Sequence, residues 1–353
     1  MRPSSEAELA ESVAGAQGPL EIIGGGSRKG FGNVVEGEAL HVSGLSGISL
    51  YDPGALTMIA AAGTPVAEVE AALANEGQML PFEPMNHAGL LGNAGKATVG
   101  GMVAVNASGP RRIKAGACRD SLIGVRYVDG MGQVVKNGGR VMKNVTGYDL
   151  VKLMAGAHGT LGVITEVAFK LLPLPEVATT LRFELGLEDG LAKLREVMAS
   201  PYDVSGTAYR DGVAMVRLEG FEDSVAYRSA QLGGEIDKSG DPWCDIRDAK
   251  GLPDAGSIWR LSVKPSDAFA VATALNEQGF ETPLFDWTGG LIWATGGNTD
   301  APRQVVSRFG GHAVCIKGSA TAFHPEPAPL AAISAGLRAK FDPRGILNPG
   351  RMG

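Results

Sequence analysis

The stretch "EIIGGGSRKGFGN", residues 21–33, places three glycines after a short apolar run and two cations after the glycines. This pattern is typical of a strand that leads into a phosphate-binding turn. The dinucleotide fingerprint would need glycine at Lys29, and the Walker loop would need lysine at Phe31, so neither common phosphate loop fits. The backbone amides of such a turn can still form an anion-binding nest. An anion site and a plain strand-to-loop connection therefore both stay open.

Length and charge limit the class of protein. The 353 residues suffice for about two domains. Lys and Arg number 32 and Asp and Glu 38, a net charge of −6 without a basic block, which argues against nucleic acid as a partner. The longest uncharged run, between Asp52 and Glu68, is broken by prolines and glycines, so no membrane insertion is expected. Acidic residues replace the apolar region of a signal peptide, which predicts a cytoplasmic protein.

The cysteines predict neither a disulfide framework nor an iron–sulfur cluster. Cys118, Cys244 and Cys315 are odd in number, far apart and without the spacing of metal ligands. Reduced thiols are the expected state.

The first half of the chain divides into two patterns. Residues 19–83 alternate strand-like and helical runs and predict a small α/β lobe, whereas residues 97–172 hold short β-branched runs that predict an antiparallel lobe. The second pattern includes a hairpin turn at Asp129 and a strand over residues 139–145. The prolines of "LLPLPE", residues 171–176, mark a boundary, which gives domains of residues 1–175 and 176–353.

The second domain repeats one order of elements. Each half reads β-α-β-β-α-β, the ferredoxin-like order, so the predicted fold class is α+β. The first half comprises expected strands and helices at residues 177–186, 188–199, 203–209, 212–219, 222–232 and 234–238; the second comprises 257–263, 266–278, 281–286, 290–295, 301–309 and 312–317.

A second glycine-rich segment, residues 96–130, carries small or polar residues inside an otherwise apolar run without an amphipathic period. Buried polar side chains need hydrogen-bond partners, which a large ligand with polar edges would supply. The alternative is a turn whose side chains satisfy one another. The residues concerned are Thr98, Gly100, Gly101, Asn106, Ser108 and Gly109.

Five motifs in order give the chain a family resemblance. It resembles the FAD-dependent oxidoreductases of the vanillyl-alcohol oxidase type, and within that group the smaller FAD-binding subunits, the E subunits, of bacterial glycolate oxidases. The resemblance implies a two-lobed FAD-binding domain followed by an α/β cap domain, with the C-terminal segment returning to the flavin. The motifs are "IIGGGSRKGFG", "LYDPGALTMIAAAGTPVAEVEAAL", "ATVGGMVAVNASG", "NVTGYDLVKLMAGAHGTLGVITEVAFKL" and "FDPRGILNPGRM".

The resemblance implies that the first loop wraps the FAD pyrophosphate with backbone amides, and that the second glycine-rich segment lines the pyrophosphate and the flavin. The segment "GTLGVIT" would meet the adenosine half. For Arg119 and Asp120 a plain surface ion pair stays open beside a role under the cofactor. The implied cofactor-binding residues are Gly24, Gly25, Gly26, Ser27, Arg28, Lys29, Gly30, Thr98, Gly100, Gly101, Asn106, Ser108, Gly109, Arg119, Asp120, Gly159, Gly162, Ile164 and Asn348.

Departures from the family pattern refine the expectation. Ser27, Arg28 and Lys29 fill the loop in which covalently flavinylated members carry a histidine, so the FAD should be non-covalent. Catalytic relatives carry a histidine-rich metal motif in the second domain. This chain keeps His312 and His324 without that spacing, so no metal is expected.

The implied function is that of the FAD-binding subunit in a complex that oxidises glycolate, a small 2-hydroxy acid, to glyoxylate. A larger FAD-binding subunit would bear the oxidation, while this chain passes electrons toward an iron–sulfur subunit. Partners of this kind would hold the chain in the cytoplasm or at the cytoplasmic face of the inner membrane. If the chain has a catalytic site of its own, Arg260 is the candidate for binding the substrate carboxylate and His324 the candidate base.

Other functions stay open. The chain could be a self-sufficient FAD-dependent dehydrogenase of another hydroxy acid or alcohol, or a structural subunit with a vestigial flavin site. Reductases of the UDP-N-acetylenolpyruvoylglucosamine type share a "TVGG"-like motif but do not explain "NVTGYDL" or "FDPRGILNPGRM".

Overall fold

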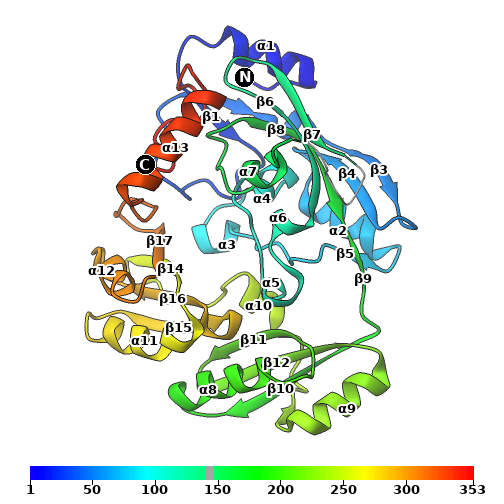
Figure 1. Cartoon of the computed structure of the whole chain (residues 1–353), viewed down its shortest axis with the longest axis vertical. Helices are drawn as coiled ribbons and strands as arrows, with labels where there is room; N and C mark the ends of the chain where they lie inside the picture. The colour runs from blue at the N-terminus through cyan, green and yellow to red at the C-terminus, as the bar shows by residue number, and fades with distance from the viewer. Residues whose placement is uncertain (140–146) are drawn as a thin grey trace. The chain divides into compact units, whose positions relative to one another are not determined.

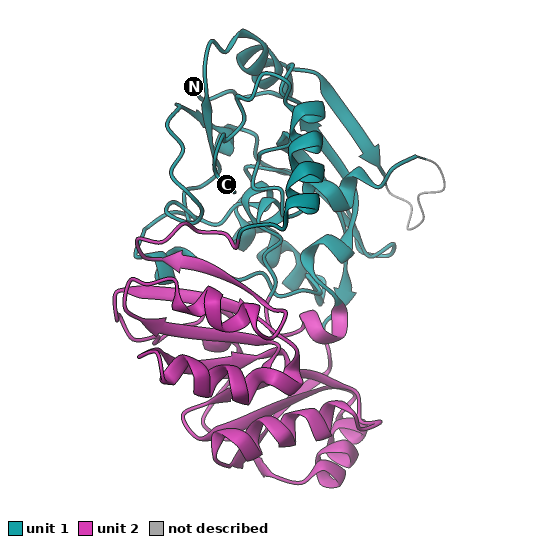
Figure 2. Cartoon of the chain, turned by 60° about the vertical axis from the view of Figure 1, so that its left-hand side comes forward, with its two compact units in different colours: residues 1–108, 116–174, 325–353 teal, residues 109–115, 175–324 magenta. Residues whose placement is uncertain are grey.

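The computed structural model describes residues 1–139 and 147–353, which form two compact units (Figure 2). Most of the strand expected over residues 139–145, and the start of the "NVTGYDL" motif, lie outside the described residues. Each unit is assembled from separate stretches of chain. Unit 1 comprises residues 1–108, 116–174 and 325–353, and unit 2 comprises residues 109–115 and 175–324.

Unit 1 contains a small parallel sheet that leads into the glycine loop. Strand β1 (Leu20–Ile23) pairs in parallel with β2 (Glu38–His41). The C-terminal segment lies along the other edge of β1, where Leu20 forms a parallel bridge with Leu347. Helix α1 (Glu6–Gly15) packs beside this sheet through an apolar cluster and is capped by Ser5, whose side chain accepts a hydrogen bond from Glu8 N.

A five-stranded antiparallel sheet forms the larger part of unit 1. Its strand order is β3-β4-β8-β6-β7, and the turn predicted at Asp129 does join β6 to β7. A two-stranded pair, β5 (Gln78–Met79) with β9 (Leu172–Pro173), lies apart from it. The strands of the larger sheet are β3 (Ile48–Asp52), β4 (Thr57–Ala61), β6 (Leu122–Val128), β7 (Val134–Gly138) and β8 (Val163–Lys170).

The place of β4 corrects one expectation. The sequence pattern assigned it to the α/β lobe of residues 19–83, whereas the structure pairs it with β8. Met58 on β4 is buried in the same apolar core as Val167 and Phe169 on β8. Tertiary burial, which local pattern does not encode, therefore decided its partner.

Short helices complete the core of unit 1. Helices α2 and α4 bury Val69, Leu73, Val99 and Met102 in the apolar cluster on the sheet, and α7 adds Met154. Their bounds, with those of the other helices of this unit, are α2 (Val66–Ala74), α3 (Ala88–Leu91), α4 (Val99–Ala104), α6 (Cys118–Ser121), α7 (Leu150–Met154) and α13 (Ala328–Phe341).

Unit 2 is built on one eight-stranded sheet with the order β13-β10-β12-β11-β15-β16-β14-β17, labelled in part in Figure 1. Strands β11 and β15 pair antiparallel and join the two halves. The strands are β10 (Val177–Glu184), β11 (Val204–Arg210), β12 (Val213–Gly220), β13 (Glu235–Ile236), β14 (Ser257–Ser262), β15 (Glu281–Asp286), β16 (Leu291–Gly296) and β17 (His312–Lys317).

The longer helices of unit 2 pack on one face of this sheet. Trp259 and Leu261 of β14 lie in a single core with Leu191, Leu194, Val271 and Leu275 from two helices. Because side chains alternate along a strand, Arg260 projects from the opposite face. These helices are α8 (Leu187–Met198), α9 (Glu222–Leu232), α11 (Ala268–Asn276) and α12 (Ala301–Ser307), whereas the short helices α5 (Arg112–Ala115) and α10 (Trp243–Arg247) lie on the opposite face.

In the described part of the chain, no helix combines the length and apolarity needed to cross a bilayer.

Candidate functional site

The glycine loop forms one wall of a pocket of about 110 Å³ in unit 1. The other walls come from α4, from the loop at His158 and from the C-terminal segment. The residues predicted from the sequence that line it are Gly24, Gly25, Gly26, Ser27, Arg28, Lys29, Thr98, Gly101 and Asn348.

Close backbone contact shapes the glycine loop. Lys96 N donates to Gly25 O over 2.9 Å, and a Cβ on Gly25 would lie 2.0 Å from Lys96 O. A Cβ on Gly95 would likewise lie 2.2 Å from Gly26 C. Glycine is therefore required here because two backbones touch. Gly26 itself has φ of 79°, a left-handed conformation that favours glycine.

Arg28 brings a partly buried positive charge to the pocket. Its Nη2 donates to Met85 O over 3.2 Å, while its Nε is enclosed and has no hydrogen-bond partner among the residues the structure describes. Burial lowers the pKa of Arg28 to about 10, so the guanidinium stays charged at neutral pH. An enclosed donor without an acceptor is costly, and an anion in the pocket would relieve that cost.

Among the lining residues that were not predicted from the sequence, three carry rings or a charge at the pocket: Phe31, His158 and Arg351. The Phe31 ring meets the His158 ring edge to face at 5.3 Å, and Arg351 pairs with Glu21 over 3.2 Å. Desolvation, followed by the charges of the two arginines at this pocket, lowers the pKa of His158 to about 4. All three lie in motifs that carry the family resemblance, so their place in those motifs could have indicated them as lining residues.

The remaining predicted cofactor residues lie outside this pocket lining. They are Gly30, Gly100, Asn106, Ser108, Gly109, Arg119, Asp120, Gly159, Gly162 and Ile164.

Two of them satisfy their side chains within their own segment. Ser108 Oγ accepts from Cys118 N over 3.0 Å and donates to the carbonyl of Asn106. Asn106 Oδ1 accepts from Arg119 N over 2.9 Å. These bonds match the alternative of a turn whose side chains satisfy one another, for Ser108 Oγ and Asn106 Oδ1. Contact of either residue with the cofactor stays a prediction.

Arg119 and Asp120 form an exposed pair. Arg119 Nε lies 3.7 Å from Asp120 Oδ1, and the side chains are 55% and 47% exposed. Asp120 also accepts from Ala117 N, which fixes the start of α6. This geometry matches the surface ion pair, which the sequence allows as the alternative to a role under the cofactor.

Several predicted glycines have a packing role. A Cβ on Gly100 would lie 2.7 Å from Ala62 Cβ, and one on Gly162 would lie 2.6 Å from the Tyr127 ring. Ile164 is buried in the core beside that ring. The carbonyl of Gly109, which belongs to unit 2, accepts from Trp287 Nε1 over 3.0 Å.

Unit 2 carries a cationic cluster around Trp287. The guanidinium carbons of Arg112 and Arg260 lie 4.7 and 5.0 Å from the centre of its ring. Trp287 and Thr288 both have positive φ, 52° and 63°. The turn is held by Asp286, whose carboxylate accepts from Trp287 N over 2.6 Å. This strained turn, held by the Asp286 hydrogen bond, fixes the Trp287 ring against both arginines.

Arg260 has the environment of an anion-binding residue. Burial, and then the charge of Arg112, lowers its pKa to about 10, while Asp286 acts in the opposite direction. At neutral pH it therefore remains a cation on the sheet face opposite the longer helices, beside Arg112 of α5.

His324 is engaged in the fold, and the charges that act on it are those of Arg303 and Asp300. Its Nδ1 accepts from Ala313 N on β17 over 3.3 Å, and its Nε2 lies 3.5 Å from Ser307 Oγ. Desolvation lowers the pKa of His324, and the pKa of His312 is lowered first by desolvation and then by Arg260. Both imidazoles are thus held neutral. Within the described ranges, no group of three or more His, Cys, Asp or Glu side chains converges as a metal site.

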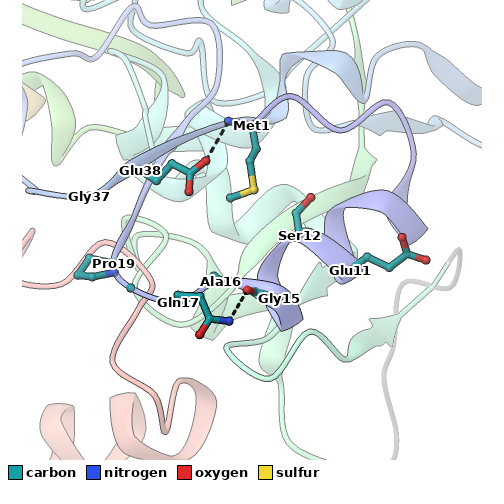
Figure 3. Close-up of a pocket in the computed structure, with 10 residues that line it drawn as sticks. Met1, Glu11, Ser12, Gly15, Ala16, Gln17, Pro19, Gly37 and Glu38 are labelled. Atoms are coloured by element: carbon teal, nitrogen blue, oxygen red, sulfur yellow. Dashed lines mark hydrogen bonds and ion pairs between the residues drawn. The ribbon is translucent and has the colours of Figure 1, made fainter.

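A larger hollow of about 540 Å³ lies beside α1 (Figure 3). Its lining includes an ion pair between the Met1 amine and Glu38 at 3.8 Å. None of the site residues predicted from the sequence lines it, and its polar groups do not converge on a common point (Figure 3). Size alone does not make it a ligand site.

Comparison with known proteins gives a consistent result. Residues 1–138 match the model of the FAD binding domain family. The chain is 40% identical over 339 residues to glycolate oxidase subunit GlcE of Escherichia coli strain K12, covering 95% of this chain and 92% of that protein. Over 183 residues it is 35% identical to glycolate oxidase subunit GlcD of Bacillus subtilis strain 168, covering 52% of this chain and 37% of that protein.

A solved structure of alkyldihydroxyacetonephosphate synthase superposes on the chain with a TM-score of 0.69 at 16% identity, covering 99% of this chain and 76% of that one. At this identity the likeness concerns the fold.

Proposed function

The chain belongs to the family of the glycolate oxidase subunit GlcE, and from this premise we propose that it is the FAD-binding subunit of a glycolate oxidase complex. It is an FAD-dependent oxidoreductase acting on the CH–OH group of a small 2-hydroxy acid. The observation that carries the proposal is the unit 1 pocket, which the glycine loop and the cationic Arg28 line inside the matched FAD-binding region.

The backbone and the charge of the pocket support a site for the pyrophosphate of FAD. A Cβ on Gly26 would find only Gly95 Cα, at 4.0 Å, so an anion can approach this backbone closely. The charge of Glu21 is offset by Arg351, which leaves Arg28 and Lys29 to attract the phosphates. Since the loop carries no histidine, the cofactor is proposed to be non-covalent.

When bound, FAD supplies the hydride acceptor for oxidation of an alcohol carbon. Within unit 2 we propose Arg260 as the residue that binds the substrate carboxylate, because it is a desolvated cation held against Trp287. We propose His324 as the proton acceptor to be tested. Its Nδ1 accepts a hydrogen bond from Ala313 N, so the neutral ring carries its proton on Nε2. To act as a base, Nδ1 must first give up the hydrogen bond from Ala313 N.

The domain roles follow from the two units. We propose that unit 2 is the cap domain, formed by two ferredoxin-like units, and that residues 1–175 with the returning C-terminal segment bind FAD. The sheet orders β13-β10-β12-β11 and β15-β16-β14-β17 support this, since both follow the ferredoxin-like arrangement.

The partners are proposed from the relatives that are named as subunits. We propose that a larger FAD-binding subunit carries glycolate oxidation and that this chain passes electrons toward an iron–sulfur subunit. Attachment through these partners would hold the chain at the cytoplasmic face of the inner membrane.

The test compares the purified chain with the chain co-expressed with both partner subunits. We expect the chain alone to bind stoichiometric FAD and to show no loss of oxidised flavin absorbance on anaerobic mixing with glycolate or D-lactate. The assembled complex should reduce a dye in the presence of glycolate. A chain that does not retain FAD would instead be a structural subunit.

One observation favours a second function, a self-sufficient hydroxy-acid dehydrogenase. The Arg112–Trp287–Arg260 cluster is an ordered cationic site within this chain. Rapid bleaching of the isolated chain by a hydroxy acid would establish this alternative. The variants Arg260→Met and His324→Ala would then show whether the two assigned roles hold.

A further inference from the structure

The C-terminal segment forms the outer edge of the strand that enters the glycine loop. Leu20 N donates to Ile346 O over 2.7 Å, and Asn348 N donates to Leu20 O over 3.0 Å. Asn33 N donates to Arg351 O over 3.0 Å, so the same segment also holds the far end of the loop. The segment therefore clasps the loop on both sides.

Asn348 makes two further bonds with its side chain. Its Oδ1 accepts from Ile22 N over 2.8 Å, and its Nδ2 donates to His158 O over 2.8 Å. The backbone partners fix the amide orientation, because an N–H needs an acceptor and a carbonyl needs a donor. A Cβ on Gly159 would lie 2.8 Å from this Nδ2, so the loop at His158 approaches the amide as closely as glycine allows.

The backbone of Asn348 explains the residue type. Its φ is 44°, in the left-handed region that asparagine tolerates better than other non-glycine residues. The residue is 4% exposed and lines the pocket. Glycine would accept the backbone but would lack the amide, so asparagine meets both requirements.

We propose that Asn348 is a positioning residue, whose amide ties β1 to the loop at His158 and so sets the distance between these two walls of the FAD pocket. The inference rests on the proposed location of FAD in that pocket. It differs from the sequence expectation, in which Asn348 contacts the cofactor directly, because both ends of the amide are already bonded to the protein.

The test uses Asn348→Asp, with Arg344→Met as the matched control. The aspartate keeps an acceptor for Ile22 N but turns a donor into an acceptor that faces His158 O. Arg344 lies in the same C-terminal segment and donates to the carbonyls of Val13, Ala14 and Ala16, away from the pocket lining. A third variant, Asn348→Gly, keeps the left-handed backbone and removes the amide.

Two quantities are measured on each cofactor-free variant: its melting temperature and its Kd for FAD, from quenching of flavin fluorescence. Loss of the buried amide hydrogen bonds predicts about a tenfold rise in Kd for Asn348→Gly, which introduces no charge into the pocket. Arg344→Met should stay within about twofold of the wild-type Kd even where it melts at a lower temperature. Asn348→Asp should weaken FAD binding at least as much as Asn348→Gly, because its carboxylate also repels the phosphates, and an unchanged Kd in Asn348→Gly would overturn the positioning role.

The outcomes separate this inference from the proposed function. Wild-type binding with an unchanged Kd in Asn348→Asp would overturn the positioning role. Equal rises in Kd for Asn348→Asp and Arg344→Met would also overturn it, because general loosening of the C-terminal segment would then suffice. Failure of the wild-type chain to bind FAD would overturn the proposed function itself.

Discussion

Acid should destabilise the cofactor-free chain through His158. The native-state pKa of this imidazole is lowered to about 4, below the ordinary value of 6.5, because it is buried near Arg351 and Arg28. A depressed native pKa means that the unfolded chain binds the proton first. The stability contributed by the neutral ring is therefore complete above about pH 6.5 and is lost as the pH falls toward 4.

The difference between the native-state pKa and the ordinary pKa of His158 gives the size of this loss of stability. Lowering the pH from about 7.5 to about 5 should remove about 2 kcal/mol of unfolding free energy through this residue alone. The assay is urea unfolding of the cofactor-free chain at both pH values, for wild type and for His158→Asn. Asparagine does not titrate and tolerates the φ of 51° at this position.

The comparison isolates His158 because every other titrating group is common to both proteins. His158→Asn loses the ring contact with Phe31, but that loss should be similar at both pH values. We expect the wild type to lose about 2 kcal/mol more than the variant over this range. Parallel losses in the two proteins would refute the idea that His158 is buried in its neutral form.

Three further predictions follow from other parts of the chain. Heat or acid should release FAD into the supernatant, and visible absorbance that stays with the precipitated polypeptide would contradict non-covalent binding. Gly25→Ala should weaken FAD binding by about tenfold or more, because its Cβ would meet Lys96 O at 2.0 Å, whereas Gly18→Ala, which meets nothing within 4 Å, should bind FAD normally in the same fluorescence titration. Glu219→Gln should cost about 3 kcal/mol in urea unfolding, because it leaves Arg111 and Arg217 beside a neutral amide in a buried cluster. Asp203→Asn breaks only the exposed pair with Lys114 and should cost about 0.5 kcal/mol, so equal losses would show that burial of the Glu219 cluster contributes nothing.

Sequence reasoning succeeded where the signal was local. The hairpin at Asp129 follows from turn chemistry, and α2 begins right after Pro65 and ends before Gly77, as the apolar period predicts. The glycine loop was identified because several glycines after a strand indicate a backbone that another group approaches closely.

Pairing between strands that are distant in the sequence could not be predicted from the local pattern. Strand β4 joins β8 across about a hundred residues, and no local period encodes that choice. Arg351 reaches the pocket only because the C-terminal segment pairs with β1. At Asn106 and Ser108 composition left a ligand and a self-satisfied turn open, and the structure shows hydrogen bonds within the turn for Asn106 Oδ1 and Ser108 Oγ.

The clasp around β1 also bears on the order of folding. The Ile22–Asn348 bond joins positions 326 residues apart, whereas each half of the unit 2 sheet is built within one continuous stretch. Contacts between distant positions must overcome a large loop-closure entropy and form late. Pulse proteolysis during refolding should therefore find unit 2 protected before the C-terminal segment. FAD would then stabilise the product of this last folding step, because it binds only the chain in which the C-terminal segment is docked. Cells short of flavin would accumulate chains whose C-terminal segment is accessible to proteases.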